Sequence, residues 1–379
     1  MRLVRLEVLE VRFPFRTAFG HASASRVSST NVLVRVWTDQ GTTGLGECVP
    51  RDYVTGETPA GAMACIETRL GPAVLGRKVE CFEETPRLLG EALPPEDGAA
   101  PEGAARCAVE LAVLDAAGRA FGRSVGELLG PSVRDRVAYS GVLPLLPPPL
   151  LVLAALAHRA YGITTIKLKV GRSLRRDLRN LKLLRAVLGP RADLRVDANC
   201  AWHADQAIEA IRAMRPYRLG AVEQPVPKDD FDGLKKVSRA VETPIMADES
   251  LCTLEDARRL ADERAVGMFN IRISKCGGLL PARQMAEIAG RAGLACQLGA
   301  HPGESAVLSA AGRHFAARTA NLRYVEGSAG MLLLKRDIAA QRVVPGRGGY
   351  APMFRGPGLG IRIDEARLEP LITARRRVA

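Results

Sequence analysis

Aromatic side chains are scarce in this chain: phenylalanine, tyrosine and tryptophan make up 4% of its 379 residues. So few rings offer little stacking surface for nucleic-acid bases. The formal net charge is +13, but the cationic residues are dispersed over a predicted helix at 174–188 or stand at 375–377, near the chain end. This spread is typical of an arginine-rich surface that mildly attracts anionic small molecules, and it does not favour nucleic acid as a partner.

Long apolar runs are also missing. No window reaches the roughly 18 uninterrupted apolar residues that a membrane helix needs, and the most apolar stretch, 142–157, is interrupted by Pro144 and by prolines at 147–149. Residues 1–15 are strand-like and carry several charges, so they lack the apolar centre of a signal peptide. We therefore expect a cytoplasmic protein with no membrane partner.

Paired cysteines are absent as well. The eight cysteines stand singly, with no C-x-x-C pair and no zinc-binding spacing, and we expect them to be buried, reduced thiols. With 47% hydrophobic and 25% charged residues, the chain has enough material for a core and does not resemble a disordered or fibrous protein. Its length suggests roughly two domains.

What the chain does have is a regular series of charged residues near the ends of predicted strands. They are separated by 28, 26, 25 and 27 residues, in the order Lys169, Asp197, Glu223, Asp248 and Lys275. Each interval is about the length of one strand plus one helix, so a repeating βα chain would bring all five to the same face of one parallel sheet. In such sheets the carboxyl ends of the strands are where ligands bind.

The βα alternation predicts the fold. Eight apolar, β-branched-rich runs end in turns: 137–143, 163–169, 194–197, 219–223, 244–248, 268–273, 294–298 and 322–325. Eight parallel strands close a barrel, so we predict a modified (β/α)8 TIM barrel over 131–330. For residues 1–130 the pattern predicts an α+β capping domain, with strands at 2–13, 31–37 and 43–47 and a helix at 103–121. We interpret 331–379, with its glycine-rich GPGLG at 356–360, as a return to that domain.

The constellation also predicts chemistry. Asp197, Glu223 and Asp248 supply the hard oxygen ligands that suit Mg²⁺, and Mn²⁺ could substitute. Lys167 and Lys169 lie two residues apart, so both point into the barrel, and mutual repulsion should lower both pKa values, which makes Lys169 a candidate base. Lys275, on the sixth strand, should face the substrate from the opposite side. A metal-held carboxylate between two lysines invites proton removal from its α-carbon, giving an enediolate stabilised by the metal.

Several short motifs carry a resemblance to a known family. They are GLGE at 44–47, KLK at 167–169, DAN at 197–199, EQP at 223–225, ADES at 247–250, SKCGG at 274–278 and GPGLG at 356–360. Together they resemble the enolase superfamily, in particular its muconate-lactonizing subgroup. The resemblance implies that the three carboxylates bind Mg²⁺, that Lys169 and Lys275 are an acid/base pair, and that Lys167 supports Lys169.

Other candidate residues have two interpretations. Asn199 and Glu249 either support the metal ligands or cap the next turn. We interpret His301 as a loop histidine lining the pocket rather than a base. Glu304 either bonds substrate or caps the helix at 305–318, and we favour the cap. The loops 19–26, with His21, and 51–57, with Tyr53, resemble the two that close over the barrel mouth in this family.

One departure from the family pattern concerns the substrate. Dipeptide epimerases of the subgroup carry an Asp-x-Asp pair where this chain places Gly327 and Ala329, which argues against an α-amino dipeptide. We expect cycloisomerisation or racemisation/epimerisation of a small-molecule carboxylate. Syn-dehydration of the o-succinylbenzoate-synthase kind is the alternative, and a non-catalytic binding protein is less favoured. The resemblance also favours a symmetric homo-oligomer.

Overall fold

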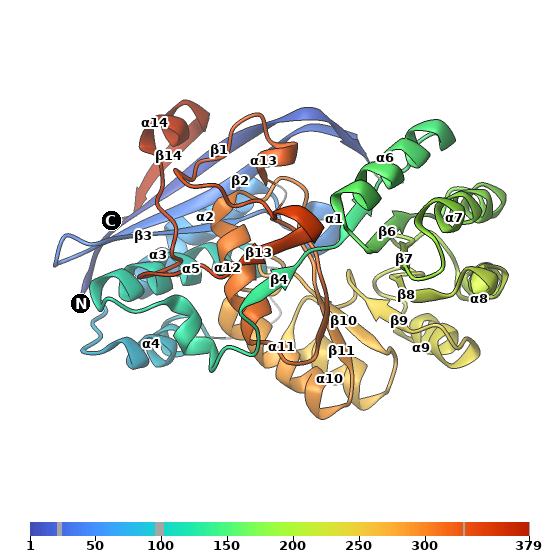
Figure 1. Ribbon diagram of the computed structural model, residues 1–379. Coiled ribbons are helices and arrows are strands. Elements are labelled where there is room, and N and C mark those ends of the chain that lie inside the picture. Colours follow the sequence, from blue (N-terminus) through green and yellow to red (C-terminus); the bar gives the residue numbers. More distant parts are fainter. Residues whose placement is uncertain (21–24, 95–101, 329, 379) are drawn as a thin grey trace.

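The computed structural model describes residues 1–20, 25–94, 102–328 and 330–378. Figure 1 shows a long antiparallel sheet with helices on one side of the molecule and a barrel of alternating strands and helices on the other. One continuous buried apolar cluster runs through both parts. No helix among the described residues is long and apolar enough to cross a membrane.

The antiparallel sheet joins the two ends of the chain. Its order is β14-β1-β2-β3, formed by β1 (Leu3–Gly20), β2 (Ser25–Thr38), β3 (Thr43–Cys48) and β14 (Ile372–Val378). The register pairs Leu6 with Val378. This confirms the predicted capping domain and its completion by the C-terminal segment.

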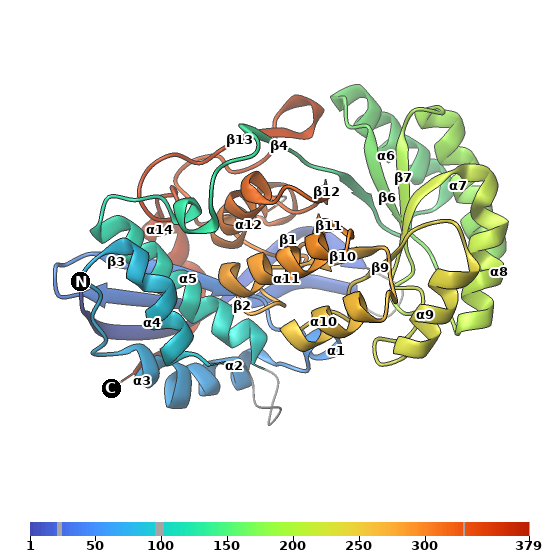
Figure 2. The same ribbon diagram turned by 90° about the horizontal axis from the view of Figure 1, so that it is seen from below.

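Helices cover one face of this sheet, as Figure 2 shows from below. The central one is α5 (Gly103–Ala120), which packs on β3 where Gly44 and Gly46 expose bare backbone. A Cβ added to Gly46 would lie 1.9 Å from Ala108 O, so only glycine permits this approach. The other segments are α1 (Asp52–Thr55), α2 (Pro59–Cys65), a π-helix at Ile66–Leu70, α3 (Gly71–Val74), α4 (Thr85–Ala92), and 3₁₀ turns at Phe82–Glu84 and Val125–Leu129.

The barrel sheet contains eight parallel strands in the order of the sequence. They are β5 (Gly141–Leu143), β6 (Thr165–Lys169), β7 (Asp193–Asp197), β8 (Leu219–Glu223), β9 (Ile245–Ala247), β10 (Met268–Ile271), β11 (Ala295–Leu298) and β12 (Leu322–Val325). A hydrogen bond from Ser140 N to Val325 O, 2.8 Å long, links the two outermost strands. The predicted TIM-barrel class is confirmed.

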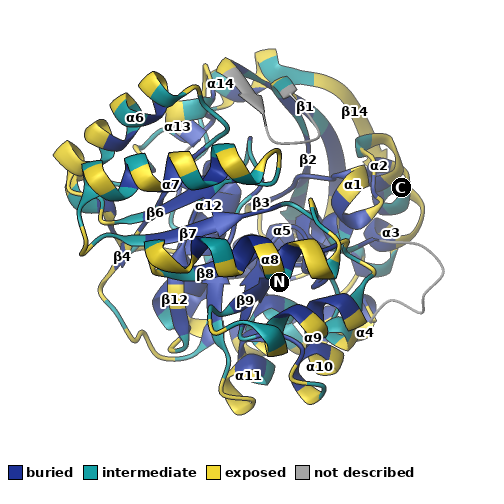
Figure 3. Cartoon of the chain, turned by 90° about the vertical axis from the view of Figure 1, so that its right-hand side faces the viewer, coloured by how far each residue is buried: buried dark blue, intermediate teal, exposed yellow. Residues whose placement is uncertain are grey.

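Amphipathic helices surround the barrel, and Figure 3 shows their exposed faces turned outward and the strands buried behind them. The barrel helices are α6 (Pro148–Tyr161), α7 (Leu174–Leu188), α8 (Ala204–Met214), α9 (Phe231–Ala240), α10 (Leu254–Asp262), α11 (Leu279–Arg291) and α12 (Ala306–Arg318), with a 3₁₀ turn at Arg215–Tyr217. After β12, the next helix found among the described residues is the short α13 (Gly330–Leu333).

The final segment returns to the capping domain. It contains a 3₁₀ turn at Arg347–Gly349, β13 (Tyr350–Pro352), α14 (Glu365–Leu368), a 3₁₀ turn at Glu369–Leu371, and β14. Within the glycine-rich stretch, Leu359 N donates to Asp115 Oδ1 on α5 at 2.8 Å. The interpretation of this stretch as a turn-rich return is therefore confirmed.

Three details of the predicted elements are wrong. The strand expected at 137–143 is two strands, because β4 (Arg136–Ala138) pairs with β13 outside the barrel before β5 begins. Asp248 and Lys275 lie beyond β9 and β10, in turns closed by Leu251 N to Asp248 O and Cys276 N to Arg272 O. The cysteines are all free, as expected, but only four of the eight are buried: Cys81 is exposed, and Cys65, Cys200 and Cys252 are half-buried.

Candidate active site at the carboxyl ends of the barrel strands

Parallel pairing places three of the predicted residues side by side. Lys169 at the end of β6 is the register partner of Asp197 on β7, which in turn is the partner of Glu223 on β8. The two carboxylate side chains are 0% and 1% exposed. The spacing of βα units thus does bring these charges together at one edge of the sheet.

Lys169 is held by two oxygen acceptors. Its Nζ donates to Asp197 Oδ2 at 2.6 Å and to Asn199 Oδ1 at 2.7 Å. Asn199 has a left-handed backbone with φ of 46°, which turns the chain back so that its amide reaches both Lys169 and Glu249. The Lys169 side chain is 11% exposed, the largest exposed fraction among the three predicted lysines.

Lys167 lies deeper in the barrel. Its Nζ is 2.9 Å from Glu223 Oε2, 2.7 Å from Glu326 Oε2 and 3.4 Å from Asp197 Oδ2. Burial acts to lower the pKa of Lys167, but these three carboxylates outweigh burial and raise its pKa above the usual lysine range. The expected lowering by Lys169 is therefore wrong for Lys167, because the sequence pattern did not reveal Glu326.

On the opposite side of the cluster stands Arg272, which sequence reasoning missed. Its guanidinium forms a close ion pair with Asp248 Oδ2, and its Nη2 lies 3.7 Å from Glu223 Oε1. The signal that could have found it is strand alternation, since Asn270, two residues earlier, donates to Glu223 Oε1 at 2.8 Å and so points into the barrel.

Lys275 has different surroundings. Its Nζ donates to the backbone oxygens of Asp248 and Asn270 and, at 3.1 Å, to Asp248 Oδ1. The side chain is 0% exposed. Burial acts to lower the pKa of Lys275, but the carboxylate of Asp248 prevails and raises it.

Asn199 and Glu249 do not cap helices. The helices that follow them, α8 and α10, begin at Ala204 and Leu254, and their N-cap residues are His203 and Thr253, so the capping interpretation is wrong. Instead Asn199 Nδ2 lies 3.3 Å from Glu249 Oε1. Burial and the neighbouring charge of Asp248 raise the pKa of Glu249 to about 8.

His301 and Glu304 follow β11 in the loop before α12. His301 is buried, its Nδ1 lies 3.4 Å from Arg272 Nη1, and its backbone N–H donates to Glu304 Oε1 at 2.7 Å. Burial, aided by the Arg272 charge, holds the pKa of His301 well below its usual range. The predicted Glu304 cap is wrong, because Ser305 caps α12 through its own hydroxyl.

The capping domain presses one loop onto this end of the barrel. Arg51 Nη2 donates to Pro302 O at 3.0 Å, and Val49 N donates to Ser274 Oγ at 2.8 Å. Tyr53, on α1, is 38% exposed and lies under Arg26, whose guanidinium carbon is 5.5 Å from the ring centroid. The other predicted contact, His21, lies outside the described residues.

The donor set fits a hard divalent cation. Asp197, Glu223 and Asp248 offer carboxylate oxygens from neighbouring strand ends, and Glu249 Oε2 is buried without a hydrogen-bond partner among the described residues. In their present positions, however, no three His, Cys, Asp or Glu side chains among the described residues are grouped so that they could hold a metal ion. Protein cations lie between them: Lys167 contacts Asp197 and Glu223, and Arg272 contacts Glu223 and Asp248.

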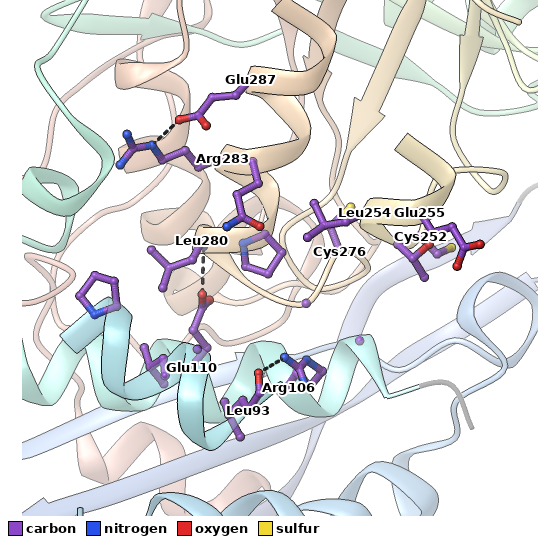
Figure 4. Close-up of a pocket in the computed structure, with 18 of the residues that line it drawn as sticks. Leu93, Arg106, Glu110, Cys252, Leu254, Glu255, Cys276, Leu280, Arg283 and Glu287 are labelled. Atoms are coloured by element: carbon purple, nitrogen blue, oxygen red, sulfur yellow. Dashed lines mark hydrogen bonds and ion pairs between the residues drawn. The ribbon is translucent and has the colours of Figure 1, made fainter. Parts of the chain in front are cut away.

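One well-defined cavity lies apart from this cluster. It measures about 730 Å³ and lies between α4 and α5 of the capping domain and α10 and α11 of the barrel. Figure 4 shows Glu110 of α5 reaching across it to the backbone of Leu280. A smaller cavity of about 180 Å³, between the 51–57 loop and the turns after β8 and β9, is lined by Glu249 and Lys275. Neither cavity is lined by Asp197, Glu223 or Asp248.

Two family matches identify the chain. Residues 2–130 match the family described as mandelate racemase / muconate lactonizing enzyme, N-terminal domain, and residues 151–367 match the family described as enolase C-terminal domain-like. The chain belongs to the enolase superfamily. This superfamily member is an isomerase, as the motifs predicted. The predicted boundaries at 130 and 330 stay predictions.

Individual relatives represent more than one reaction. N-succinyl Arg/Lys racemase from Bacillus cereus has a TM-score of 0.92 at 27% identity, with 100% of both chains covered. Dipeptide epimerase from Enterococcus faecalis, complexed with Mg and the dipeptide L-Leu-L-Tyr, has a TM-score of 0.86 at 29% identity over 95% of this chain and 99% of that one. Muconate cycloisomerase 1 from Pseudomonas putida is 31% identical over 350 residues, which are 90% of each chain.

Proposed function

We propose that this enolase-superfamily member is a magnesium-dependent enzyme that removes the proton α to a carboxylate of a small-molecule substrate, with Lys169 as the base. The observation that carries the proposal is the position of Lys169. Its Nζ lies 2.6 Å from Asp197 Oδ2 at the carboxyl ends of the barrel strands, and it is more exposed than Lys167 or Lys275.

The proton transfer uses groups of this chain. The neutral amine of Lys169 accepts the α-proton, the C–H bond breaks, and its electron pair passes into the carboxyl group to give an enediolate. Asp197 and Asn199 fix the position of Nζ. The loop anchored by Arg51 covers this end of the barrel and limits the access of water.

Asp197, Glu223 and Asp248 would hold the Mg²⁺, for which Mn²⁺ could substitute. When bound, the ion supplies positive charge that stabilises the enediolate oxygens. The carboxylates already share cations in pairs, Lys167 between Asp197 and Glu223 and Arg272 between Glu223 and Asp248. The Mg named in the complex of the dipeptide epimerase relative supports the choice of ion.

The overall reaction that we propose is cycloisomerisation or racemisation/epimerisation, with syn-dehydration as the alternative. The named relatives include a racemase, an epimerase and a cycloisomerase. An α-amino dipeptide is not favoured, because Gly327 has φ of 99° and an added Cβ would lie 2.9 Å from the Ala300 Cβ. An aspartate is therefore strained there, and Ala329 lies outside the described residues. A homo-oligomer stays a prediction.

The test is an exchange screen in deuterated water. The protein with Mg²⁺ is incubated with a library of carboxylic acids that includes N-acyl amino acids, dipeptides and muconates, and mass spectrometry records deuterium at the α-carbon. We expect at least one acid to exchange with the wild type and not with Lys169→Ala. If no acid exchanges, a non-catalytic binding protein becomes the better account.

A further inference from the structure

Arg272 occupies the position from which a second base would have to act. It follows β10 with the same inward parity as Asn270, and its side chain is 8% exposed. Strand β10 lies four strands from β6 in the barrel order. The Arg272 guanidinium therefore faces the carboxylate cluster from the side opposite Lys169.

Lys275 does not share this position. Its three ammonium protons are matched by three acceptors, two of which are backbone oxygens at the ends of β9 and β10. Its backbone also lies against the capping domain, because a Cβ added to Gly103 would be 2.7 Å from Lys275 O. An ammonium held in this way joins the strand ends and is not directed at the substrate.

His301 provides a donor and not a base on the same side. Arginine has only N–H donors, so His301 Nδ1, which faces Arg272 Nη1, must accept, and the ring proton is then on Nε2. That Nε2 is buried and has no hydrogen-bond partner among the described residues. A buried donor without a partner points to an acceptor oxygen of a ligand.

We infer that this site has a single base, Lys169, and that Arg272 with His301 forms a fixed donor face for oxygen atoms of an anionic substrate. This assignment rests on the proposed α-proton abstraction, and it distinguishes between the overall reactions proposed above. Guanidinium stays protonated under all ordinary conditions, so Arg272 cannot accept a proton from the opposite face of the α-carbon. The ammonium formed at Lys169 returns its proton to the face from which it came.

The class of reaction follows from the presence of one base, Lys169, and of a permanently protonated Arg272 on the opposite face. Racemisation needs one proton donor and one acceptor on opposite faces of the α-carbon, which this site does not have. Cycloisomerisation and syn-elimination need one group that gives or takes the proton on one face, while the bond made or broken belongs to the substrate. The relatives include both kinds of isomerase by name, and Arg272 favours the one-base kind for this chain.

The experiment measures deuterium exchange separately for the two stereoisomers of each acid that exchanges. Wild type, Lys275→Met and Arg272→Lys are compared by NMR, with Mg²⁺ and identical protein concentrations. We expect wild type to exchange one stereoisomer at least 100-fold faster than the other, and Lys275→Met to keep that preference even if its rate falls. Arg272→Lys, which introduces an amine, should raise exchange of the disfavoured stereoisomer.

A wild type that exchanges both stereoisomers at comparable rates overturns the inference, whichever of them Lys275→Met retains. Exchange confined to one stereoisomer in wild type and Lys275→Met supports it, and a folded Arg272→Lys that still does not exchange the second stereoisomer contradicts the position assigned to Arg272. A separate measurement needs no substrate: reductive methylation of the folded protein, followed by peptide mass spectrometry, should modify Lys169 at least tenfold faster than Lys275. Equal methylation rates would contradict the claim that the Lys275 ammonium is enclosed. Absence of deuterium exchange with every acid would instead count against the proposed function.

Discussion

Asp197 and Glu223 are register partners across the β7–β8 ladder, and the ammonium of Lys167 reaches both carboxylates, at 3.4 Å and 2.9 Å. Two buried carboxylates this close repel each other unless a cation lies between them. Lys167 is therefore a positioning residue for the cluster, and it also meets Glu326, which Arg195 contacts from its other oxygen at 2.8 Å.

Removing that cation should destabilise the fold. Lys167→Met leaves Glu223 and Glu326 buried with fewer partners, and breaking a buried ion pair on one side costs about 3–5 kcal/mol. Urea unfolding followed by circular dichroism measures the change, with Lys182→Ala on the exposed face of α7 as the control. A loss below about 1 kcal/mol would show that the network does not depend on Lys167.

Magnesium should stabilise the protein through the three carboxylates. Binding to the folded state raises the melting temperature by mass action, so Mg²⁺ should raise that of wild type and have little effect on Asp248→Asn. The variant should also be less stable without metal, since Arg272 and Lys275 lose their shared carboxylate. Asp205→Asn, at an exposed ion pair, is the control. An Asp248→Asn protein that responds to Mg²⁺ like wild type would exclude Asp248 as a ligand.

Stability should fall as the pH rises through the range in which buried glutamates ionise. Burial raises the pKa of Glu110 from 4.5 to about 8, although the N–H groups of Leu280 and Leu279 oppose the shift. The neutral form is favoured in the fold, so this contribution is complete below about pH 4.5 and is lost as the pH rises through about 8. The raised pKa values of Glu47, about 7, and Glu304, about 8, act in the same direction.

Glu110→Gln should reduce this pH dependence. One full proton corresponds to a slope of about 1.4 kcal/mol per pH unit, so the difference between pH 5 and pH 9 should shrink measurably in urea titrations. Glu255→Gln, exposed at the same cavity, is the matched control. An unchanged pH profile for Glu110→Gln would show that Glu110 is ionised in the fold across the whole range.

Two glycines of the capping domain should respond in opposite ways to alanine. At Gly46 the new methyl group would meet Ala108 O of α5, and such overpacking costs about 1–3 kcal/mol or more. At Gly90, inside α4, the methyl group meets nothing within 4 Å, and helix propensity should add up to about 1 kcal/mol of stability. Thermal melts of both variants compare the signs directly, and equal effects would contradict the packing of α5 on β3.

The sequence predicted the fold and part of the site because both follow from local spacing. One strand and one helix per 25 to 28 residues determine which strand ends are neighbours, and Lys169, Asp197 and Glu223 are indeed adjacent across their ladders. The position of Lys275 was not predictable in this way. It lies four residues beyond the end of β10, in a turn where strand alternation no longer gives the direction of a side chain.

Contacts made by residues far apart in the sequence were missed. Glu326, the residue after β12, reaches Lys167 across the closure of the barrel, and no spacing rule connects the two. Glu47 of β3 accepts hydrogen bonds at the start of α12, from Ser305 N and Leu308 N, and its GLGE motif gives no sign of this contact. Arg272 was overlooked because a lysine three residues later matched the expected spacing.

The central claim is that Lys169 removes a proton α to a carboxylate, and its most direct test is the rate of α-deuterium incorporation into one exchanging acid. The rate is measured by mass spectrometry in deuterated water with Mg²⁺, for wild type, Lys169→Ala and the exposed control Lys182→Ala. Wild type and Lys182→Ala should incorporate deuterium at the same rate, and Lys169→Ala should be at least 1,000-fold slower, on the scale of general-base catalysis of about 10²–10⁴. Incorporation by folded Lys169→Ala within about tenfold of wild type would contradict the account.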